Sequence, residues 1–255
     1  MYSAACIEWL FAAEHPDFSD RIRAAKAAGL GAVEFWLWRD KDINAIKSAL
    51  DETGVKITCF CVDPRRSLVD PAQHSEVLDA VRDSLAVARE LGSPMLILAS
   101  GFTVFNVPRR QQHDAAVAVL RKAAAMAAEA GITLVLEPLN TKIELPGMYL
   151  GSTSEGLDIV AEVDSPNLRL LFDVYHSTTN GEQLESALFA GMPFIGYIQV
   201  ADAPGRQEPG TGTLDWSHTI RVIKGLGYKG AIGLECKPSG PTAEALERSR
   251  KALGF

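Results

Sequence analysis

Short apolar runs alternate with longer amphipathic segments along the whole chain. The runs are rich in β-branched and aliphatic residues and favour strands, whereas the longer segments carry apolar residues at the spacing of a helix face. This pattern repeats eight times, and a helical segment follows every run. In chain order the strand candidates are ACIEWL, AVEFW, KITCFCV, PMLILAS, TLVLEPL, LRLLFDVYH, FIGYIQVAD and AIGLECKP.

The ends of several predicted helices carry residues that favour helix termini. Glycine is common just after a helix because it adopts the left-handed conformation without steric cost, and it stands at Gly29, Gly54, Gly92, Gly131 and Gly227. Short polar side chains can accept the free N–H groups of a first turn, which predicts N-caps at Asp17, Asp42, Ser152 and Thr242.

Eight strand–helix units predict an α/β fold whose parallel sheet closes into a (β/α)8 TIM barrel. A doubly wound open sheet is the competing architecture, but the chain has neither a G-x-G-x-x-G fingerprint nor a Walker sequence. No linker, low-complexity tract or block of like charge interrupts the pattern. The sequence therefore predicts a single barrel domain over residues 1–255.

The composition of the chain disfavours some binding partners and some cellular locations. The chain of 255 residues is 47% hydrophobic and 22% charged, and it lacks an apolar run of the roughly 18 residues that a membrane helix needs. A net charge of −7 disfavours binding to nucleic acid. The N-terminus lacks a basic start, and the four cysteines have no Cys-x-x-Cys spacing, which indicates reduced core residues. We expect a cytoplasmic protein with no membrane or nucleic-acid partner.

Four consecutive strands of the second half end in polar residues. These are Glu137, Asp173 with His176, Gln199 with Asp202, and Glu235. In a barrel the carboxyl ends of the strands form the active-site mouth, and the spacing of about one strand–helix unit brings one such side chain from each unit to it. One polar strand end has little weight, because a solvated or salt-bridged side chain is the usual explanation, but four in succession predict a site.

Convergence of three carboxylates predicts a cation. Buried like charges repel one another and are costly to desolvate, and a divalent ion removes both costs. Three carboxylates and an amide oxygen form a hard, all-oxygen ligand set suited to Mg²⁺ or Mn²⁺, with Co²⁺ as a further candidate. The predicted ligands are Glu137, Asp173, Gln199 and Glu235. We expect His176 to contact substrate rather than metal, and no organic cofactor is required.

The segments LVLEPLN, FDVYH, YIQVADAPGRQEPGTG and LECKP resemble the hydroxypyruvate isomerase group of the xylose-isomerase-like barrels, which are related to ketose 3-epimerases. The resemblance is specific over residues 131–238 and only architectural before them. It implies that Glu137 and Glu235 are acid/base groups that also bind the metal, with Asp173 and Gln199 completing the metal site. Glutamine at 199 favours the hydroxypyruvate isomerase branch, since the epimerases usually have histidine at the matching position.

The loop GRQEPGTG resembles the RGEPGTG signature of that branch, which implies that Arg206 and Glu208 lie near the substrate. We expect this loop to be a mobile cover over the site, although a phosphate cradle at Gly210–Gly212 is an alternative. The loops DPRRSLVDPAQH and LWRDKD, after the third and second strands, depart from the family pattern. Because both line the predicted mouth, the substrate stays open.

The resemblance implies a metal-dependent isomerase of a small hydroxy-keto acid or sugar, including oxo-tetronate-type substrates, acting through glutamate-mediated proton transfer and a metal-stabilised enediolate. A ketose 3-epimerase and an inosose isomerase or dehydratase use the same apparatus. An apurinic endonuclease is disfavoured by the acidic charge and the scarcity of histidine. A non-catalytic sugar-binding barrel is disfavoured by the presence of both glutamates. Relatives often dimerise or tetramerise, so a homo-oligomer is a further expectation.

Overall fold

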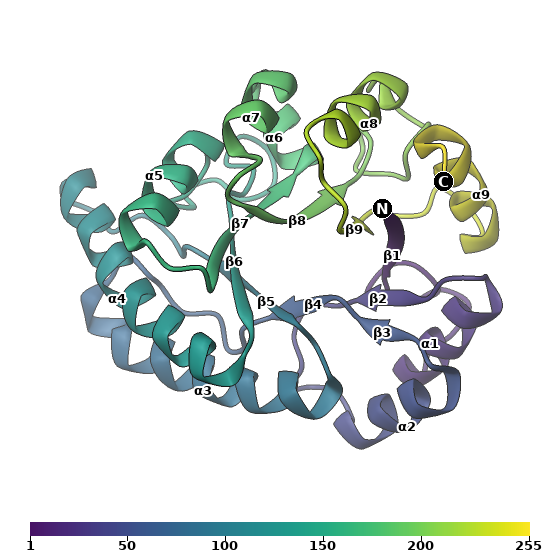
Figure 1. Ribbon diagram of the computed structural model, residues 1–255, viewed down its shortest axis with the longest axis horizontal. Helices are drawn as coiled ribbons and strands as arrows, with labels where there is room; N and C mark the ends of the chain where they lie inside the picture. The colour runs from purple at the N-terminus through teal and green to yellow at the C-terminus, as the bar shows by residue number, and fades with distance from the viewer.

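The computed structural model of the protein describes residues 1–255 and has the predicted barrel architecture (Figure 1). Its strands surround a central axis and its helices form the outer layer. The strands are β1 (Tyr2–Cys6), β2 (Ala32–Glu34), β3 (Lys56–Ile57), β4 (Cys59–Cys61), β5 (Met95–Ala99), β6 (Thr133–Glu137), β7 (Leu168–Asp173), β8 (Ile195–Val200) and β9 (Ala231–Leu234).

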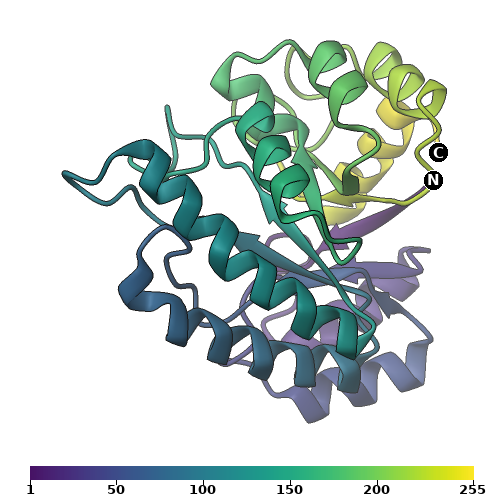
Figure 2. The same cartoon turned by 60° about the vertical axis from the view of Figure 1, so that its left-hand side comes forward.

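The helices form the layer outside the strands, and the two longest, which span residues 74–91 and 109–130, lie side by side on the outside of the barrel (Figure 2). The helices are α1 (Phe18–Ala27), α2 (Ile43–Thr53), the 3-10 turn η1 (Pro71–Gln73), α3 (His74–Leu91), α4 (Arg109–Ala130), α5 (Thr153–Val163), α6 (Val174–Asn180), α7 (Leu184–Gly191), α8 (Trp216–Gly225) and α9 (Thr242–Leu253).

All strand pairs are parallel, and the order is β3-β2-β1-β9-β8-β7-β6-β5-β4. The third predicted strand, KITCFCV, is divided at Thr58 into β3, which pairs with β2, and β4, which pairs with β5. The two ends of the sheet are therefore consecutive in the chain. The backbone N–H of Cys61 donates to the carbonyl of Trp36 at 2.9 Å, so the eight-unit barrel closes across this division.

Side chains alternate between the two faces of each strand and form two cores. The larger core lies between the strands and the helices, as the apolar helix faces require. The smaller one fills the barrel and is made of Ala4, Ala32, Cys59, Cys61, Ile97, Val135, Leu171, Tyr197 and Ala231. Because strand side chains repeat every two residues, positions two beyond these continue the same inward rows toward the mouth.

The predicted N-caps are confirmed at three of four positions. Asp17, Asp42 and Ser152 each accept a backbone N–H from the first turn of their helix. The prediction for Thr242 is wrong, because Thr242 is the first residue of α9 and its N–H donates to Glu14 Oε1 at 2.8 Å. A carboxylate distant in sequence performs the capping there.

The four cysteines are buried and unpaired, as predicted. No helix has the length and apolar character required to cross a membrane. The cytoplasmic location and the homo-oligomeric state stay predictions.

Candidate active site

The four predicted ligand residues occupy inward positions at the carboxyl ends of β6 to β9. Glu137 and Asp173 are the last residues of β6 and β7, Gln199 is the last but one residue of β8, and Glu235 directly follows β9. Asp173 and Gln199 are partners in the strand register. Along each of these strands, the side chains that point into the barrel are therefore apolar in its interior and polar at its mouth.

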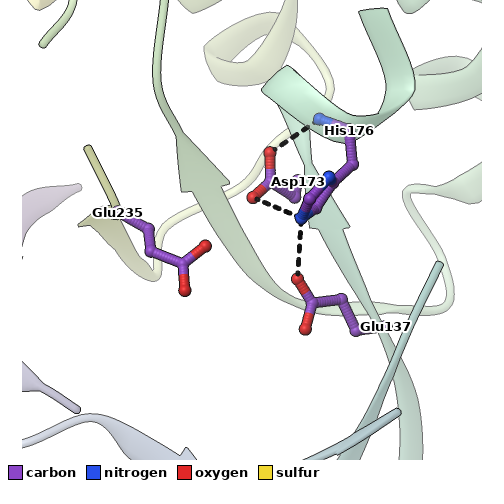
Figure 3. A group of neighbouring side chains, drawn as sticks. All are labelled: Glu137, Asp173, His176 and Glu235. Carbon is purple, nitrogen blue, oxygen red and sulfur yellow. Dashed lines mark hydrogen bonds and ion pairs between the residues drawn. The ribbon is translucent and has the colours of Figure 1, made fainter. Parts of the chain in front are cut away.

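Ligand atoms from Glu137, Asp173, His176 and Glu235 lie within 4.8 Å of one another, and all four residues are buried. Figure 3 shows Glu235 facing the other three side chains. The Asp173 carboxylate also caps α6, since its Oδ1 accepts the backbone N–H of His176 at 3.0 Å. This cap places the histidine ring beside the carboxylates.

Burial and like charge raise the pKa of two carboxyl groups of this cluster. Desolvation is the main cause for Glu137, with repulsion from Glu235 and Asp173 adding to it, and its pKa lies well above the ordinary value. Desolvation likewise raises the pKa of Asp173, against the opposing effect of Arg206. These carboxylates therefore lack the compensation that buried charges need, and a cation between them would supply it.

Among the buried side-chain oxygens without a hydrogen-bond partner in the protein, two belong to the predicted ligand residues, Asp173 Oδ2 and Gln199 Oε1. Unsatisfied buried acceptors are rare because each forfeits the hydrogen bonds it would make in water. Both belong to the predicted ligand set and are hard oxygen donors. The residues present thus fit a divalent ion of the Mg²⁺ or Mn²⁺ type.

His176 is a neutral donor in this arrangement. Its Nδ1 accepts the backbone N–H of Asn140 at 3.1 Å, which assigns the ring proton to Nε2. Desolvation, together with the charge of Arg206, lowers the pKa of His176 to about 4. Nε2 lies 3.7 Å from Glu137 Oε1 and 3.8 Å from Asp173 Oδ2. A protonated Nε2 has no lone pair for a metal. Nη2 of Arg206 lies 3.2 Å from Nε2 and can only donate, so these two N–H groups together suit an oxygen of a ligand in the cavity as their acceptor.

Arg206 enters the site from the loop after β8. One Nη donates to Glu235 Oε2 and the other to Glu144 Oε2, each at 2.5 Å. The guanidinium lies over the rings of Trp9 and Tyr175, at 5.0 and 5.2 Å from their centroids. Although burial alone lowers the pKa of a guanidinium, these carboxylates raise that of Arg206. Arg206 offsets part of the negative charge of the cluster, chiefly at Glu235.

Glu208 lies away from the cavity, unlike the substrate contact that the resemblance implied. Its side chain is fully buried and accepts hydrogen bonds from the backbone N–H and hydroxyl of Ser239, and it pairs with Arg248. These partners occupy both carboxylate oxygens. Glu208 therefore ties the loop to α9 and to the segment before it, and Arg206 is the residue of this loop that lines the cavity.

Asp202 fastens the other side of the same loop. Its carboxylate accepts the N–H of Gly210 and the indole N–H of Trp216, each at 2.8 Å. Burial opposes ionisation, but these hydrogen bonds prevail and the pKa of Asp202 is lowered. The Gly210 N–H is bonded to Asp202, so Gly210–Gly212 does not form the phosphate cradle that was an alternative. Asp202 and Glu208 anchor the loop on both sides, unlike the mobile cover that was expected.

The sequence reasoning missed several residues at the site, among them Glu34, Trp36 and Arg65. The Trp36 indole donates to Glu235 Oε1 at 2.6 Å, and Glu34 lies below the cluster at the end of β2. Arg65 lines the cavity from the loop after β4. Glu34 could have been identified from the sequence, because it is an acid inside the apolar run AVEFW. No feature of the neighbouring sequence marks Trp36 or Arg65 as site residues.

Three members of the cluster, Glu137, His176 and Glu235, line a cavity of about 220 Å³. Apolar walls from Trp9, Trp36 and Leu139 face polar groups from Glu137, His176 and Glu235. The volume is below the range of about 300 to 1,000 Å³ of pockets for drug-sized ligands, so the cavity suits a small metabolite.

The chain is similar to known proteins over nearly its full length. It is 30% identical to the hydroxypyruvate isomerase of Escherichia coli K12, covering 90% of this chain and 92% of that protein. It is also 30% identical to the 2-oxo-tetronate isomerase of Cupriavidus necator, covering 93% and 94%. The solved structure of an AP endonuclease, family 2, from Brucella melitensis has a TM-score of 0.90 and 29% identity, covering 96% of each chain.

A match to the family described as xylose isomerase-like TIM barrel extends over residues 22–253. It spans both the strand ends that carry the acidic cluster and the helices that enclose the barrel. The sequence match and the observed architecture agree, and the chain belongs to the xylose isomerase-like TIM barrel family.

Proposed function

We propose that the protein is a metal-dependent isomerase of small hydroxy-keto acids such as hydroxypyruvate or a 2-oxo-tetronate. Its isomerase class follows from the two relatives with this activity, which it matches over nearly the whole chain. The observation that carries the mechanism is the convergence of Glu137, Asp173 and Glu235 around buried acceptors without partners.

Glu137, Asp173, Gln199 and Glu235 would hold the divalent ion, as Mg²⁺, Mn²⁺ or Co²⁺. When bound, such an ion supplies Lewis-acid polarisation of a substrate carbonyl. The His176 Nε2–H is available to donate to a substrate oxygen, since Nδ1 is engaged by Asn140. Arg206 holds Glu235 on one side while the Trp36 indole holds it on the other.

Glu137 and Glu235 perform the proton transfer from opposite sides of the cavity. One carboxylate removes a proton from the carbon that bears the hydroxyl, next to the carbonyl, and an enediolate is left. Return of a proton to the former carbonyl carbon, with the hydroxyl proton redistributed, converts the ketone to an aldehyde. For hydroxypyruvate this moves hydrogen from C3 to C2, and the atoms balance without an oxidant or an organic cofactor.

Arg65 supports an acid as substrate. Three arginines line the cavity, and two of them are paired with carboxylates: Arg206 with Glu144 and Glu235, and Arg66 with Glu76. Arg65 forms no ion pair, and its side-chain contact is with Cys61 Sγ at 3.7 Å. A guanidinium without a carboxylate partner at the wall of a small cavity is suited to hold the carboxylate of a keto acid.

Replacing Arg65 with glutamine should therefore raise KM for hydroxypyruvate by roughly 10- to 100-fold, the equivalent of losing one charge-assisted hydrogen bond. Binding of dihydroxyacetone, which replaces the carboxylate with a hydroxymethyl group, should not change. Steady-state kinetics and competitive inhibition measure the two effects. Arg66→Gln is the matched control because Arg66 is already paired. Equal losses for the acid and the neutral ketone would contradict the role of Arg65 as a carboxylate anchor.

Solvent exchange tests the proposed reaction directly. In deuterated buffer with Mg²⁺, the protein should exchange the C3 protons of hydroxypyruvate and form 2-hydroxy-3-oxopropanoate, both followed by proton NMR against a sample without protein. Four-carbon oxo-acids and C4 to C6 ketoses complete the panel. Return of the proton to the opposite face of the same carbon would produce an epimer, which identifies the ketose 3-epimerase alternative. No exchange with any member, with Mg²⁺, Mn²⁺ or Co²⁺, would exclude the proposal.

A further inference from the structure

The Glu34 side chain points into the barrel interior and is buried next to the predicted metal ligands. It is the last residue of β2 and is 1% exposed. Its side chain crosses the barrel interior toward β9, where Gly233 leaves the space it needs, since a Cβ at that position would overlap the Glu34 carboxylate. The glycine and the acid are thus complementary across the barrel. The proton-transfer mechanism described above does not use Glu34.

The Glu34 carboxylate contacts both inward side chains of β8. Its Oε1 accepts Nε2–H of Gln199 at 2.8 Å, and its Oε2 accepts the hydroxyl of Tyr197. The Tyr197 oxygen lies 2.9 Å from Thr58 Oγ1, at the division between β3 and β4. A hydroxyl can both donate and accept, so the Tyr197 oxygen could also accept a proton carried by Glu34 Oε2, and Oε1 would still accept from Gln199.

These contacts orient the Gln199 side chain. An amide has a donating and an accepting end, and only the NH₂ end can bond to an accepting carboxylate oxygen. The accepting end, Oε1, is then directed away from Glu34 and remains buried without a protein partner. Gln199 is the register partner of Asp173, whose Oδ2 is likewise buried without a hydrogen-bond partner. If the amide were rotated by 180°, its oxygen would face the Glu34 oxygen, which is repulsive, and its NH₂ group would point to the metal site.

We propose that Glu34 is a positioning residue, which holds the Gln199 amide with its oxygen toward the metal site. Glutamine is a weaker and more flexible ligand than a carboxylate, and partners of this kind orient ligands and tune their affinity. The inference rests on the proposed metal site but assigns a task to a residue outside the ligand set. Tyr197 and Thr58 extend the hydrogen-bond chain that holds Glu34 in place.

The test is Mn²⁺ binding by isothermal titration calorimetry, with protein freed of metal by a chelator. Removing a partner of a metal ligand typically costs 10- to 100-fold in affinity, so Glu34→Ala should weaken Mn²⁺ binding by about that factor. Glu34→Gln should restore most of the affinity, because its amide oxygen can accept from Gln199 while its NH₂ faces the Tyr197 oxygen. In a Gln199→Ala background, Glu34→Ala should have no further effect.

Controls separate positioning from general destabilisation. Gln112→Ala removes another buried polar side chain, whose hydrogen bonds go to the backbone of Val104 and Val107, and Mn²⁺ affinity should be unchanged. Should Glu34→Ala fail to fold, Tyr197→Phe removes one anchor of the carboxylate and should weaken Mn²⁺ binding by a smaller factor. Wild-type affinity in Glu34→Ala or in Tyr197→Phe, or an equal loss in the Gln199→Ala background, would overturn the positioning role alone. Absence of Mn²⁺ binding by the wild-type protein would overturn the metal site as well.

Discussion

Replacing Glu137 or Glu235 with glutamine is expected to lower kcat for hydroxypyruvate isomerisation by about 10²- to 10⁴-fold, the usual contribution of a positioned acid/base group. Glutamine retains the shape of the side chain and an oxygen ligand but cannot take a proton. Steady-state kinetics at saturating Mn²⁺ separate this effect from weaker metal binding. Glu247→Gln, at an exposed ion pair with Lys251, is a matched control that should retain wild-type kcat.

The two variants should also differ from each other in deuterated buffer. If one glutamate removes the proton and the other returns it, only one variant should retain exchange of the substrate proton without forming product. Trp36 and Arg206 hold Glu235, whereas Glu137 accepts no hydrogen bond from the protein, so the two groups are not equivalent. Wild-type turnover in either variant would remove that glutamate from the mechanism.

The second large effect is metal-dependent stabilisation. A ligand at 100 times its Kd stabilises the folded protein by about 2.7 kcal/mol, so saturating Mn²⁺ should raise Tm by on the order of 5 to 10 °C in protein freed of metal by a chelator. Chelation should abolish activity, and added Mn²⁺ should restore it. Differential scanning calorimetry measures the shift.

Asp173→Asn is the informative variant for this experiment. Asparagine can still cap α6, so the local structure that depends on Asp173 Oδ1 should be preserved. The charge that the ion requires is lost, and the increase in Tm with Mn²⁺ should shrink or disappear. An undiminished shift in Asp173→Asn would place the bound ion outside the acidic cluster.

The strand-end residues were accessible to prediction because barrel topology converts sequence position into spatial position. Once eight strands are identified, Glu137, Asp173 and Glu235 must meet at one mouth, whatever the details of packing. The same reasoning could not place Glu208, because its location depends on a loop whose course is decided by Asp202 and by the partners Ser239 and Arg248. It also missed Glu34, whose acid lies inside an apolar run and needs a glycine on a distant strand to be accommodated.

By itself the sequence determined the alternation of strands and helices, the barrel, and the approach of an acidic set to the mouth, since these follow from local periodicity and chain order. Tertiary structure alone decided which of those polar groups face the cavity and in what state. The tautomer of His176 depends on the backbone of Asn140, and the orientation of Gln199 depends on Glu34. Such choices arise from hydrogen bonds between residues far apart in the chain, and no local pattern records them.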